Sequence, residues 1–284
     1  MTKAMKIRAI KTCRRPIAGL GLFLLFAAGL LLGIRYGERV VQRFHLDAPV
    51  CPLPVLMYHN VVSDGKETNS MTVTVSKLRE DFAYLRDHGY TAILPRDLLS
   101  GEALPEKPVL LTFDDGYVSN YMLLYPLLQE YGMKAVISPI VYMTDLWEDG
   151  FCLWPMYREM AASGLVEVGS HTYNLHNPDS GMDYVTGGAN GVQRRNGESD
   201  AAFRERVLED IQRSYDRIAA ELGTEPVCFA YPFGVTEPDA QTLIDELFPV
   251  SLVTRPGTAD LYEGTVRLPR WTVTMEEPLS NFLR

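Results

Sequence analysis

The sequence predicts an α/β domain with a mostly parallel sheet of about seven strands, preceded by one membrane-spanning helix. From about residue 53 onward, short apolar runs alternate with amphipathic stretches, as strands and helices do in parallel sheets. An uncharged N-terminal stretch that follows a basic one predicts the membrane helix. Polar residues suited to chemistry follow several apolar runs, and this placement favours a barrel, because barrel enzymes build their sites at the carboxyl ends of strands.

The N-terminus has the composition of a membrane anchor. Six basic residues and no acidic residue precede position 16, and residues 16–34 are uncharged. A helix of that length spans about 28 Å, close to a hydrocarbon core of about 30 Å, and the basic flank predicts a cytoplasmic N-terminus. The run lacks a small-residue cleavage site at its end, so an anchor is favoured over a cleaved signal peptide, which stays an alternative. We expect a tail and anchor over residues 1–35, a linker over 36–52 and one extracytoplasmic domain over 53–284.

Charge and cysteine content limit the partners and the chemistry. The formal net charge is −9, so the chain without its six N-terminal basic residues carries about −15. This acidity argues against nucleic acid as a partner and is compatible with a neutral or cationic glycan. Cys13 precedes the expected anchor, and the other three cysteines allow one disulfide at most. None lies beside the His or Asp pairs described below, so we expect no catalytic cysteine.

Seven short apolar runs, each bounded by turn-forming or polar residues, are the expected strands. They span residues 55–58, 91–94, 109–113, 135–138, 166–169, 227–231 and 250–254. Two amphipathic helices are the clearest. One spans residues 201–222 and ends at Gly223, and the other spans 77–88, with Ser76 as its candidate N-cap and Gly89 as its C-terminal stop.

Two adjacent acidic residues follow the third expected strand. Asp114 and Asp115 should emerge where the sheet ends, and Gly116 allows the chain to turn sharply there. Two like charges this close raise the free energy of the fold unless a cation or a proton offsets one of them. An isolated Asp-Asp pair is more often a turn or a helix cap, and its position at a strand end is what favours chemistry here.

Two histidines follow the fifth expected strand. His171 and His176 would lie roughly 140° apart on one helix, so a shared metal ion requires a loop or an irregular turn. One Asp and two His form a three-ligand set that holds a divalent cation and leaves a position open for water. Residues 177–200, rich in polar and turn-forming residues, predict a long loop that either borders this site or is a plain insertion.

Three segments of the chain resemble a known family. Residues 112–117 (Thr-Phe-Asp-Asp-Gly-Tyr), residues 170–172 (Ser-His-Thr) with His176, and residues 230–234 (Ala-Tyr-Pro-Phe-Gly) are similar to the first three motifs of polysaccharide deacetylases, the NodB-homology or carbohydrate esterase family 4 enzymes. The resemblance extends roughly over residues 53–270. The segment around His59 and the spacing of the two histidines most resemble the branch that acts on poly-N-acetylglucosamine.

The resemblance implies a deformed (β/α) barrel and a metal-dependent N-deacetylase. It implies that Asp115, His171 and His176 are the metal ligands. It also implies that Asp114 is the general base and that the backbone N–H of Phe233 donates to the oxyanion. Two imidazoles and one carboxylate suit Zn²⁺, and Co²⁺, Ni²⁺ and Fe²⁺ accept the same ligand types.

The sequence departs from the family pattern at two points. The family's third motif usually carries an Arg that orients the catalytic Asp, and Ala230 occupies that place. Arg255 and Arg270 are candidates to replace it. The family's late Leu-x-His motif, which supplies a general acid, is also missing, because no His follows His176. His59, after the first strand, is the candidate replacement, with a structural hydrogen bond at the barrel mouth as the alternative.

The remaining candidate residues would contact the substrate. They are Tyr117, Arg270 and Trp271. The chain has three tryptophans, Trp147, Trp154 and Trp271, whose rings could stack on sugars. Packing within the protein is the alternative role for each of them.

The expected function is a membrane-anchored hydrolase that removes N-acetyl groups from an amino-sugar polymer at the cell envelope, with poly-N-acetylglucosamine favoured over peptidoglycan. The alternative is a catalytically degenerate glycan-binding or assembly module of the same fold. A metal phosphoesterase is disfavoured, because many such sites pair two metal ions and only one ligand set is visible. No protein partner is predicted.

Overall fold

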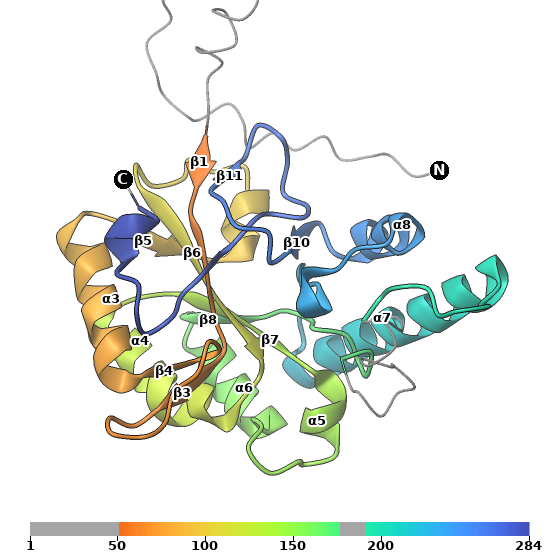
Figure 1. Ribbon diagram of the computed structural model, residues 1–284, viewed down its shortest axis with the longest axis horizontal. Coiled ribbons are helices and arrows are strands. Elements are labelled where there is room, and N and C mark those ends of the chain that lie inside the picture. Colours follow the sequence, from red (N-terminus) through yellow and green to blue (C-terminus); the bar gives the residue numbers. More distant parts are fainter. Residues whose placement is uncertain (1–50, 177–190, 284) are drawn as a thin grey trace, which may run out of the picture.

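The computed structural model of the protein describes residues 51–176 and 191–283. A parallel sheet forms its centre, with strand order β12-β2-β6-β7-β8 and with β5 paired to the start of β6 (Figure 1). These strands are β2 (Val55–Tyr58), β5 (Thr91–Ile93), β6 (Pro108–Asp115), β7 (Ala135–Pro139), β8 (Val166–Val168) and β12 (Trp271–Thr272). All eight residues of β6 are buried, so it forms the middle of the sheet.

Two further strands and two single bridges close the sheet into a deformed, barrel-like ring. These strands are β9 (Cys228–Ala230) and β10 (Val250–Leu252), which pair in parallel. Ser170, just after β8, bridges to Phe229 in β9, and its N–H donates to the Cys228 carbonyl oxygen at 2.8 Å. Leu252 in β10 bridges to Leu268, just before β12. Because closure at these two places rests on single bridges and not on full ladders, the barrel is deformed, as the resemblance implies.

Each of the seven expected strands overlaps an observed strand, and β6 runs two residues further than expected, through Asp114 and Asp115. The sequence prediction missed β12 and four other strands. The latter are β1 (Pro52–Leu53), β3 (Asn60–Val62), β4 (Thr72–Thr74) and β11 (Ala259–Asp260), of which β1 pairs with β11 and β3 with β4. With two or three residues each, these strands are too short to show an alternating pattern.

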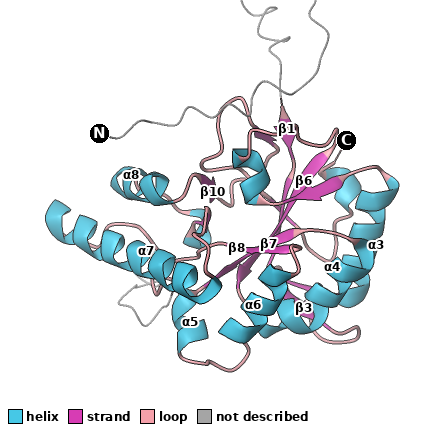
Figure 2. Cartoon of the chain, turned by 180° about the vertical axis from the view of Figure 1, so that it is seen from behind, coloured by secondary structure: helices cyan, strands magenta, loops and turns pink. Residues whose placement is uncertain are grey.

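Helices flank the barrel, with α3 and α4 on one side and α7 and α8 on the other (Figures 1 and 2). The helices are α3 (Val75–Asp87), α4 (Tyr125–Tyr131), α5 (Val141–Asp145), α6 (Trp154–Ala162), α7 (Asp200–Leu222) and α8 (Pro238–Leu247). Four shorter helical segments join them: η3 (Pro95–Leu99), η4 (Asn120–Leu124), η6 (Pro232–Gly234) and η7 (Leu279–Asn281).

The core is divided by the alternation of side chains along β6. Leu110 packs with residues of the surrounding strands inside the barrel, whereas Leu111 and Phe113 pack in the cluster that includes residues of α3, α4 and α6. Successive side chains in a strand point to opposite faces, so Thr112 and Asp114 share the inward face with Leu110. This alternation brings Asp114 into the barrel interior at the carboxyl end of β6.

The two clearest predicted helices form, with one correction. α7 starts one residue before the expected position and ends at Gly223, whose φ is 70°, as its C-cap. α3 begins at Val75, so the expected N-cap at Ser76 is wrong. Thr74 caps the helix, because its Oγ1 accepts the Lys77 N–H at 3.2 Å. The Ser76 hydroxyl donates instead to Asp64 at 2.8 Å.

The expected anchor over residues 16–34 and the first 14 residues of the expected loop over 177–200 lie outside the described residues. Within the ranges 51–176 and 191–283, the helices are too short or too polar to cross a bilayer. In those ranges Cys152 and Cys228 are buried free thiols.

Candidate functional site

The end of β6 presents the acid pair, Asp114 and Asp115, at the carboxyl edge of the sheet. Asp115 has φ 70° and Gly116 has φ 82°, so the chain turns sharply after two left-handed residues. Only glycine fits at position 116, because a Cβ there would lie 2.3 Å from Tyr157 Oη and 2.8 Å from Pro139 Cβ. The turn directs Asp115 away from the strand alternation and toward the loop that follows β8.

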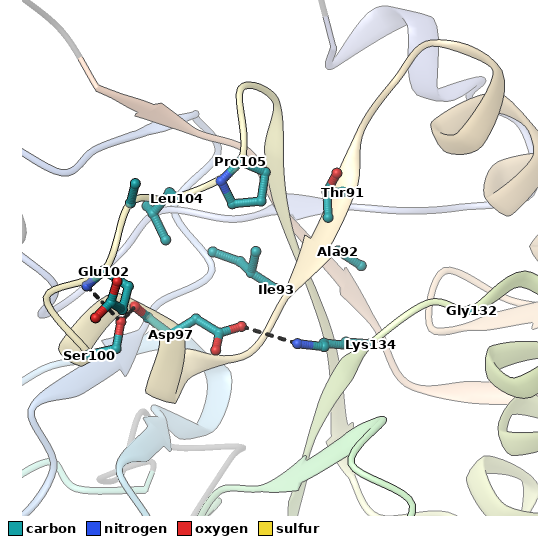
Figure 3. Close-up of a pocket in the computed structure, with 11 residues that line it drawn as sticks. Thr91, Ala92, Ile93, Asp97, Ser100, Glu102, Leu104, Pro105, Gly132 and Lys134 are labelled. Atoms are coloured by element: carbon teal, nitrogen blue, oxygen red, sulfur yellow. Dashed lines mark hydrogen bonds and ion pairs between the residues drawn. The ribbon is translucent and has the colours of Figure 1, made fainter. Parts of the chain in front are cut away.

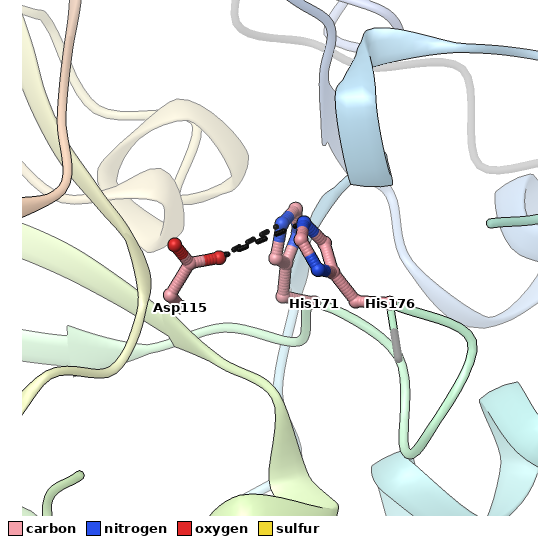
Figure 4. Close-up of side chains that lie close together, drawn as sticks. All are labelled: Asp115, His171 and His176. Carbon is pink, nitrogen blue, oxygen red and sulfur yellow. Dashed lines mark ion pairs between the residues drawn. The ribbon is translucent and has the colours of Figure 1, made fainter. Parts of the chain in front are cut away.

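The three side chains predicted as metal ligands lie together (Figure 4). Their nearest ligand atoms, one from each of Asp115, His171 and His176, are all within 4.8 Å of one another. Asp115 Oδ1 lies 3.5 Å from His171 Nε2 and 3.8 Å from His176 Nε2. One carboxylate oxygen and two imidazole nitrogens therefore face a common point, although they come from segments more than fifty residues apart.

The hydrogen bonds of these side chains leave acceptor atoms directed at this point, as a bound cation requires. Asp115 Oδ1 is buried and has no hydrogen-bond partner in the protein. His171 Nδ1 lies 2.7 Å from the Ala230 carbonyl oxygen, which can only accept, so Nδ1 carries the proton and Nε2 presents its lone pair toward Asp115. The His176 ring stacks on Phe233 with a centroid distance of 4.3 Å. An orphaned carboxylate oxygen beside an imidazole lone pair is the donor chemistry of a divalent metal site.

Burial disfavours charge on all three side chains when no cation is bound. It raises the pKa of Asp115 to about 6 and lowers the pKa of His171 to about 3. It also lowers the pKa of His176. The histidines are therefore neutral near pH 7, which is the state that binds metals, and a bound dication would offset the buried charge of Asp115.

Asp114 forms a buried ion pair with Arg270. The guanidinium donates from Nη1 to Oδ1 at 2.8 Å and from Nη2 to Oδ2 at 2.7 Å. Arg270 also donates to Thr112 Oγ1 and to the Val253 carbonyl oxygen, both at 3.1 Å. Burial acts to raise the pKa of Asp114, but the charge of Arg270, with a smaller contribution from His171, lowers that pKa well below its ordinary value. Asp114 is thus a fixed, ionised carboxylate.

This ion pair distinguishes the two arginines that could stand in for the missing motif residue. Arg270 contacts Asp114, whereas Arg255 is exposed and contributes its backbone carbonyl oxygen to the Arg270 N–H at 2.9 Å. Arg270 is also 0% exposed, so it does not offer its side chain to a substrate. Arg270 therefore positions Asp114, and its side chain is too deeply buried to make the expected contact with a substrate.

His59 lies close enough to the acid pair to act on it electrostatically. It directly follows β2, is half-buried, and its backbone carbonyl oxygen accepts the Asn120 side-chain N–H at 3.0 Å. A positive charge on His59 lowers the pKa of Asp115 and, as a lesser contribution, that of Asp114. β2 pairs with β6 so that Tyr58 lies opposite Phe113, which places His59 level with Asp114 at the same edge of the sheet.

Tyr117 and Phe233 also border the candidate ligands. Tyr117 directly follows Gly116, and burial, with the Asp115 charge, raises the pKa of Tyr117 to about 12. Phe233 is 38% exposed and has φ 59°, a conformation that bulky residues rarely adopt. The backbone is also left-handed at Asp115 and at Thr172, the residue that follows His171. Such strain gathers at functional sites, where the surrounding structure holds it.

The tryptophans have protein contacts of their own. Trp271 Nε1 donates to Thr258 at 3.2 Å, and the Trp271 ring stacks on Phe282. Trp154 is buried and donates to Asp145 at 2.8 Å, whereas Trp147 is 75% exposed. A sugar contact at Trp271 stays a prediction.

A pocket of about 320 Å³ lies at the other end of the strands (Figure 3). It is lined by all three residues of β5, by residues of the segment that joins β5 to β6, and by Lys134, just before β7, which forms an ion pair with Asp97 at 3.6 Å. Because β5 pairs with the start of β6 and Lys134 precedes β7, the pocket is separate from the acid pair at the carboxyl end of β6.

Residues 101–247 match the family described as polysaccharide deacetylase. A poly-β-1,6-N-acetyl-D-glucosamine N-deacetylase of Escherichia coli strain K12 is 32% identical over 202 residues, which cover 63% of this chain and 30% of that protein. The chain thus matches less than a third of the length of this relative. The matched family region contains Asp114, Asp115, His171 and His176, and it excludes His59 and Arg270.

Two solved structures share the fold. The de-N-acetylase from Aggregatibacter actinomycetemcomitans superposes with a TM-score of 0.68 at 28% identity, over 82% of this chain and all of that one. IcaB from Ammonifex degensii superposes with a TM-score of 0.67 at 27% identity, over 79% of this chain and 93% of that one.

Proposed function

The chain belongs to the polysaccharide deacetylase family, and from this premise we propose that it is a metal-dependent hydrolase that removes N-acetyl groups from an amino-sugar polysaccharide at the cell envelope. Poly-N-acetylglucosamine is the favoured substrate and peptidoglycan the second choice. One observation carries the proposal: Asp115 and the two histidines converge beside a second carboxylate that Arg270 fixes in place.

Asp115, His171 and His176 would hold the metal ion, with Zn²⁺ as the default and Co²⁺, Ni²⁺ or Fe²⁺ as alternatives. A divalent cation in such a site polarises an acetamide carbonyl and lowers the pKa of water to near neutrality. The orphaned Asp115 Oδ1 and the neutral histidines support this assignment.

The proton transfers are assigned to two residues outside the ligand set. Asp114 accepts the proton of the attacking water, because each of its oxygens keeps a lone pair after bonding to Arg270. His59 donates a proton to the departing amine. The backbone N–H of Phe233 stabilises the developing oxyanion, and Tyr117 and Trp271 contact the sugar. The products are acetate and a free amine.

The favoured substrate and the location rest on different observations. The Escherichia coli relative is named for poly-β-1,6-N-acetyl-D-glucosamine, and that polymer is neutral before deacetylation, so the acidic chain tolerates it. The basic and uncharged N-terminal stretches support an anchored, extracytoplasmic domain at the cell membrane.

The alternative of a catalytically degenerate glycan-binding module rests on Ala230 and on the missing late His. The contact between Arg270 and Asp114 removes the first of these two reasons, because a guanidinium holds the carboxylate despite Ala230. The second reason depends on whether His59 acts as the acid.

A product assay tests the proposed function. Purified full-length protein should release acetate and free amines from N-acetylglucosamine oligomers faster than from peptidoglycan, and a chelator should abolish the release until Zn²⁺ or Co²⁺ is restored. If the metal-loaded protein releases acetate from neither polymer, the proposal fails and the binding module is favoured. If only peptidoglycan is deacetylated, the substrate assignment changes and the chemistry stands.

The general-acid assignment predicts that His59→Ala lowers kcat by about 10²-fold, because acid catalysis typically contributes a factor of 10²–10⁴. The loss should be smaller on an activated acetate ester, whose leaving group departs without a proton. His88→Ala is the matched control, because His88 is an exposed histidine at the end of α3. An equal loss on ester and amide would show that His59 acts in another way.

A further inference from the structure

The segment between the two histidines, residues 172–175, is here called the ligand loop. Each of its four backbone N–H groups has an acceptor from a side chain, although the loop forms neither helix nor strand. The Tyr173 and Asn174 N–H groups donate to Oδ1 and Oδ2 of Asp210, both at 2.8 Å. The Thr172 N–H donates to Ser170 Oγ at 3.2 Å, and the Leu175 N–H to Thr172 Oγ1 at 3.1 Å.

Asp210 belongs to α7, more than thirty residues away in sequence. One carboxylate that accepts two consecutive N–H groups fixes the direction of both peptide planes, because each oxygen points at one donor. These two peptides lie midway between His171 and His176. The carboxylate therefore sets the curvature of the chain that carries both imidazoles.

Ser214, one helical turn further along α7, forms a second link between this helix and the start of the ligand loop. Its hydroxyl donates to the Ile211 carbonyl oxygen at 2.9 Å and lies 2.8 Å from Ser170 Oγ. The Ser170 hydroxyl therefore donates to Ser214 and accepts from Thr172, which uses its single proton and one of its two lone pairs. Ser214 is 0% exposed, which makes each of these bonds hard to replace with water.

The other side of the ligand loop is held as well. The Thr172 and Tyr173 carbonyl oxygens accept from the Val141 and Tyr142 N–H groups at 3.2 and 2.9 Å, at the start of α5. The Arg213 guanidinium lies 3.8 Å from the centre of the Tyr173 ring. Thr172 keeps φ 73°, which is unfavourable for a β-branched residue, so the loop is held in a conformation that it would leave without these contacts.

We propose that Asp210, assisted by Ser214, is the positioning residue of the metal centre: α7 fixes the ligand loop so that His171 and His176 meet Asp115. This inference rests on the proposed function, because it assumes that the three side chains bind a cation. Asp210 does not touch the metal, and its effect reaches the ion through the backbone that carries the two imidazoles.

The test compares metal binding by full-length Asp210→Asn with wild type. Asparagine has the same shape, but its NH₂ group would face one of the two N–H donors, so one contact becomes repulsive. We expect the Zn²⁺ dissociation constant of the variant, measured by competition with a chelator, to be about ten-fold higher than that of wild type. A ten-fold loss is at the lower end of the range for residues that orient metal ligands. The visible spectrum of bound Co²⁺ should also change, because the imidazole geometry changes.

Asp216→Asn is the matched control, since Asp216 lies on the same helix, is exposed, and accepts a hydrogen bond from the Gln212 side chain at 2.9 Å, away from the ligand loop. It should leave Zn²⁺ affinity within two-fold of wild type. Ser214→Ala, a favourable helix substitution, should weaken Zn²⁺ about three-fold and provides the test if Asp210→Asn does not fold.

The outcomes separate the two proposals. If Asp210→Asn and Ser214→Ala keep both the wild-type Zn²⁺ affinity and the wild-type Co²⁺ spectrum, the positioning role is wrong, even if the melting temperature falls. If wild-type protein itself binds no divalent cation, the metal-dependent function is wrong and the positioning role with it.

Discussion

Asp114→Asn is expected to lower kcat by about 10³-fold, within the range of 10²–10⁴ that a general base contributes. The substitution keeps the shape of the side chain, but it replaces one carboxylate oxygen with an NH₂ group and removes the negative charge, so the side chain no longer accepts a proton. The candidate metal ligands are untouched, so Zn²⁺ affinity should stay within a few-fold of wild type. Acetate release under saturating substrate, together with the zinc content of the purified variant, measures both quantities.

The Asp114→Asn variant must be shown to fold, because it leaves the Arg270 guanidinium buried without a counter-ion. Removal of one partner of a buried ion pair lowers the free energy of unfolding by about 3–5 kcal/mol. A thermal melt before the assay settles whether the remaining protein is native. Asp115→Asn is the contrasting variant, since it should lose zinc and activity together. Activity of Asp114→Asn within ten-fold of wild type would show that another group takes the proton.

The sequence predicted the fold wherever an element was long enough to show its period. The apolar runs that became β2, β6 and β7 were placed within two residues of their observed ends, and α7 within one. β12 was missed because Trp271 and Thr272 are too few to alternate, yet it completes the barrel by pairing with β2. Tertiary contacts, and not local propensity, make such a strand.

The candidate site was predictable in part because strand ends converge. Asp115 ends β6 and His171 follows β8, and both strands belong to one parallel sheet with β7 between them, so topology places both residues at the same edge of the sheet. Arg270 and Asp114 are 156 positions apart in the sequence, so no local sequence pattern predicts their contact. Asp210 was hidden for a different reason: it is one of several acidic residues of an amphipathic helix, most of which face solvent. Only the three-dimensional structure separates the one that binds the ligand loop from the others.

Arg270→Met is expected to lower the free energy of unfolding by about 3–5 kcal/mol at pH 8, because it leaves the Asp114 carboxylate charged and buried without its partner. Methionine keeps much of the length of the side chain, so lost packing contributes less than lost charge. Arg255→Met is the control, since Arg255 is exposed and should change stability by less than about 0.5 kcal/mol. Denaturant unfolding in the presence of a chelator measures both variants.

The pH dependence distinguishes lost charge from lost packing. In wild type the pKa of Asp114 is depressed by Arg270, so the pair stabilises the fold above the unfolded pKa of about 4, and this contribution is lost as the pH falls through the folded pKa. In Arg270→Met the guanidinium no longer opposes burial, and burial raises the pKa of Asp114, so we expect the folded variant to take up its proton at a higher pH than the unfolded chain. The difference in stability between wild type and variant should therefore be largest at pH 8 and shrink as the pH falls toward 4. A difference that is constant over this range would mean that the guanidinium contributes packing alone.

The double variant Asp114→Asn with Arg270→Met should be more stable than Arg270→Met at pH 8, because it removes the unpaired carboxylate.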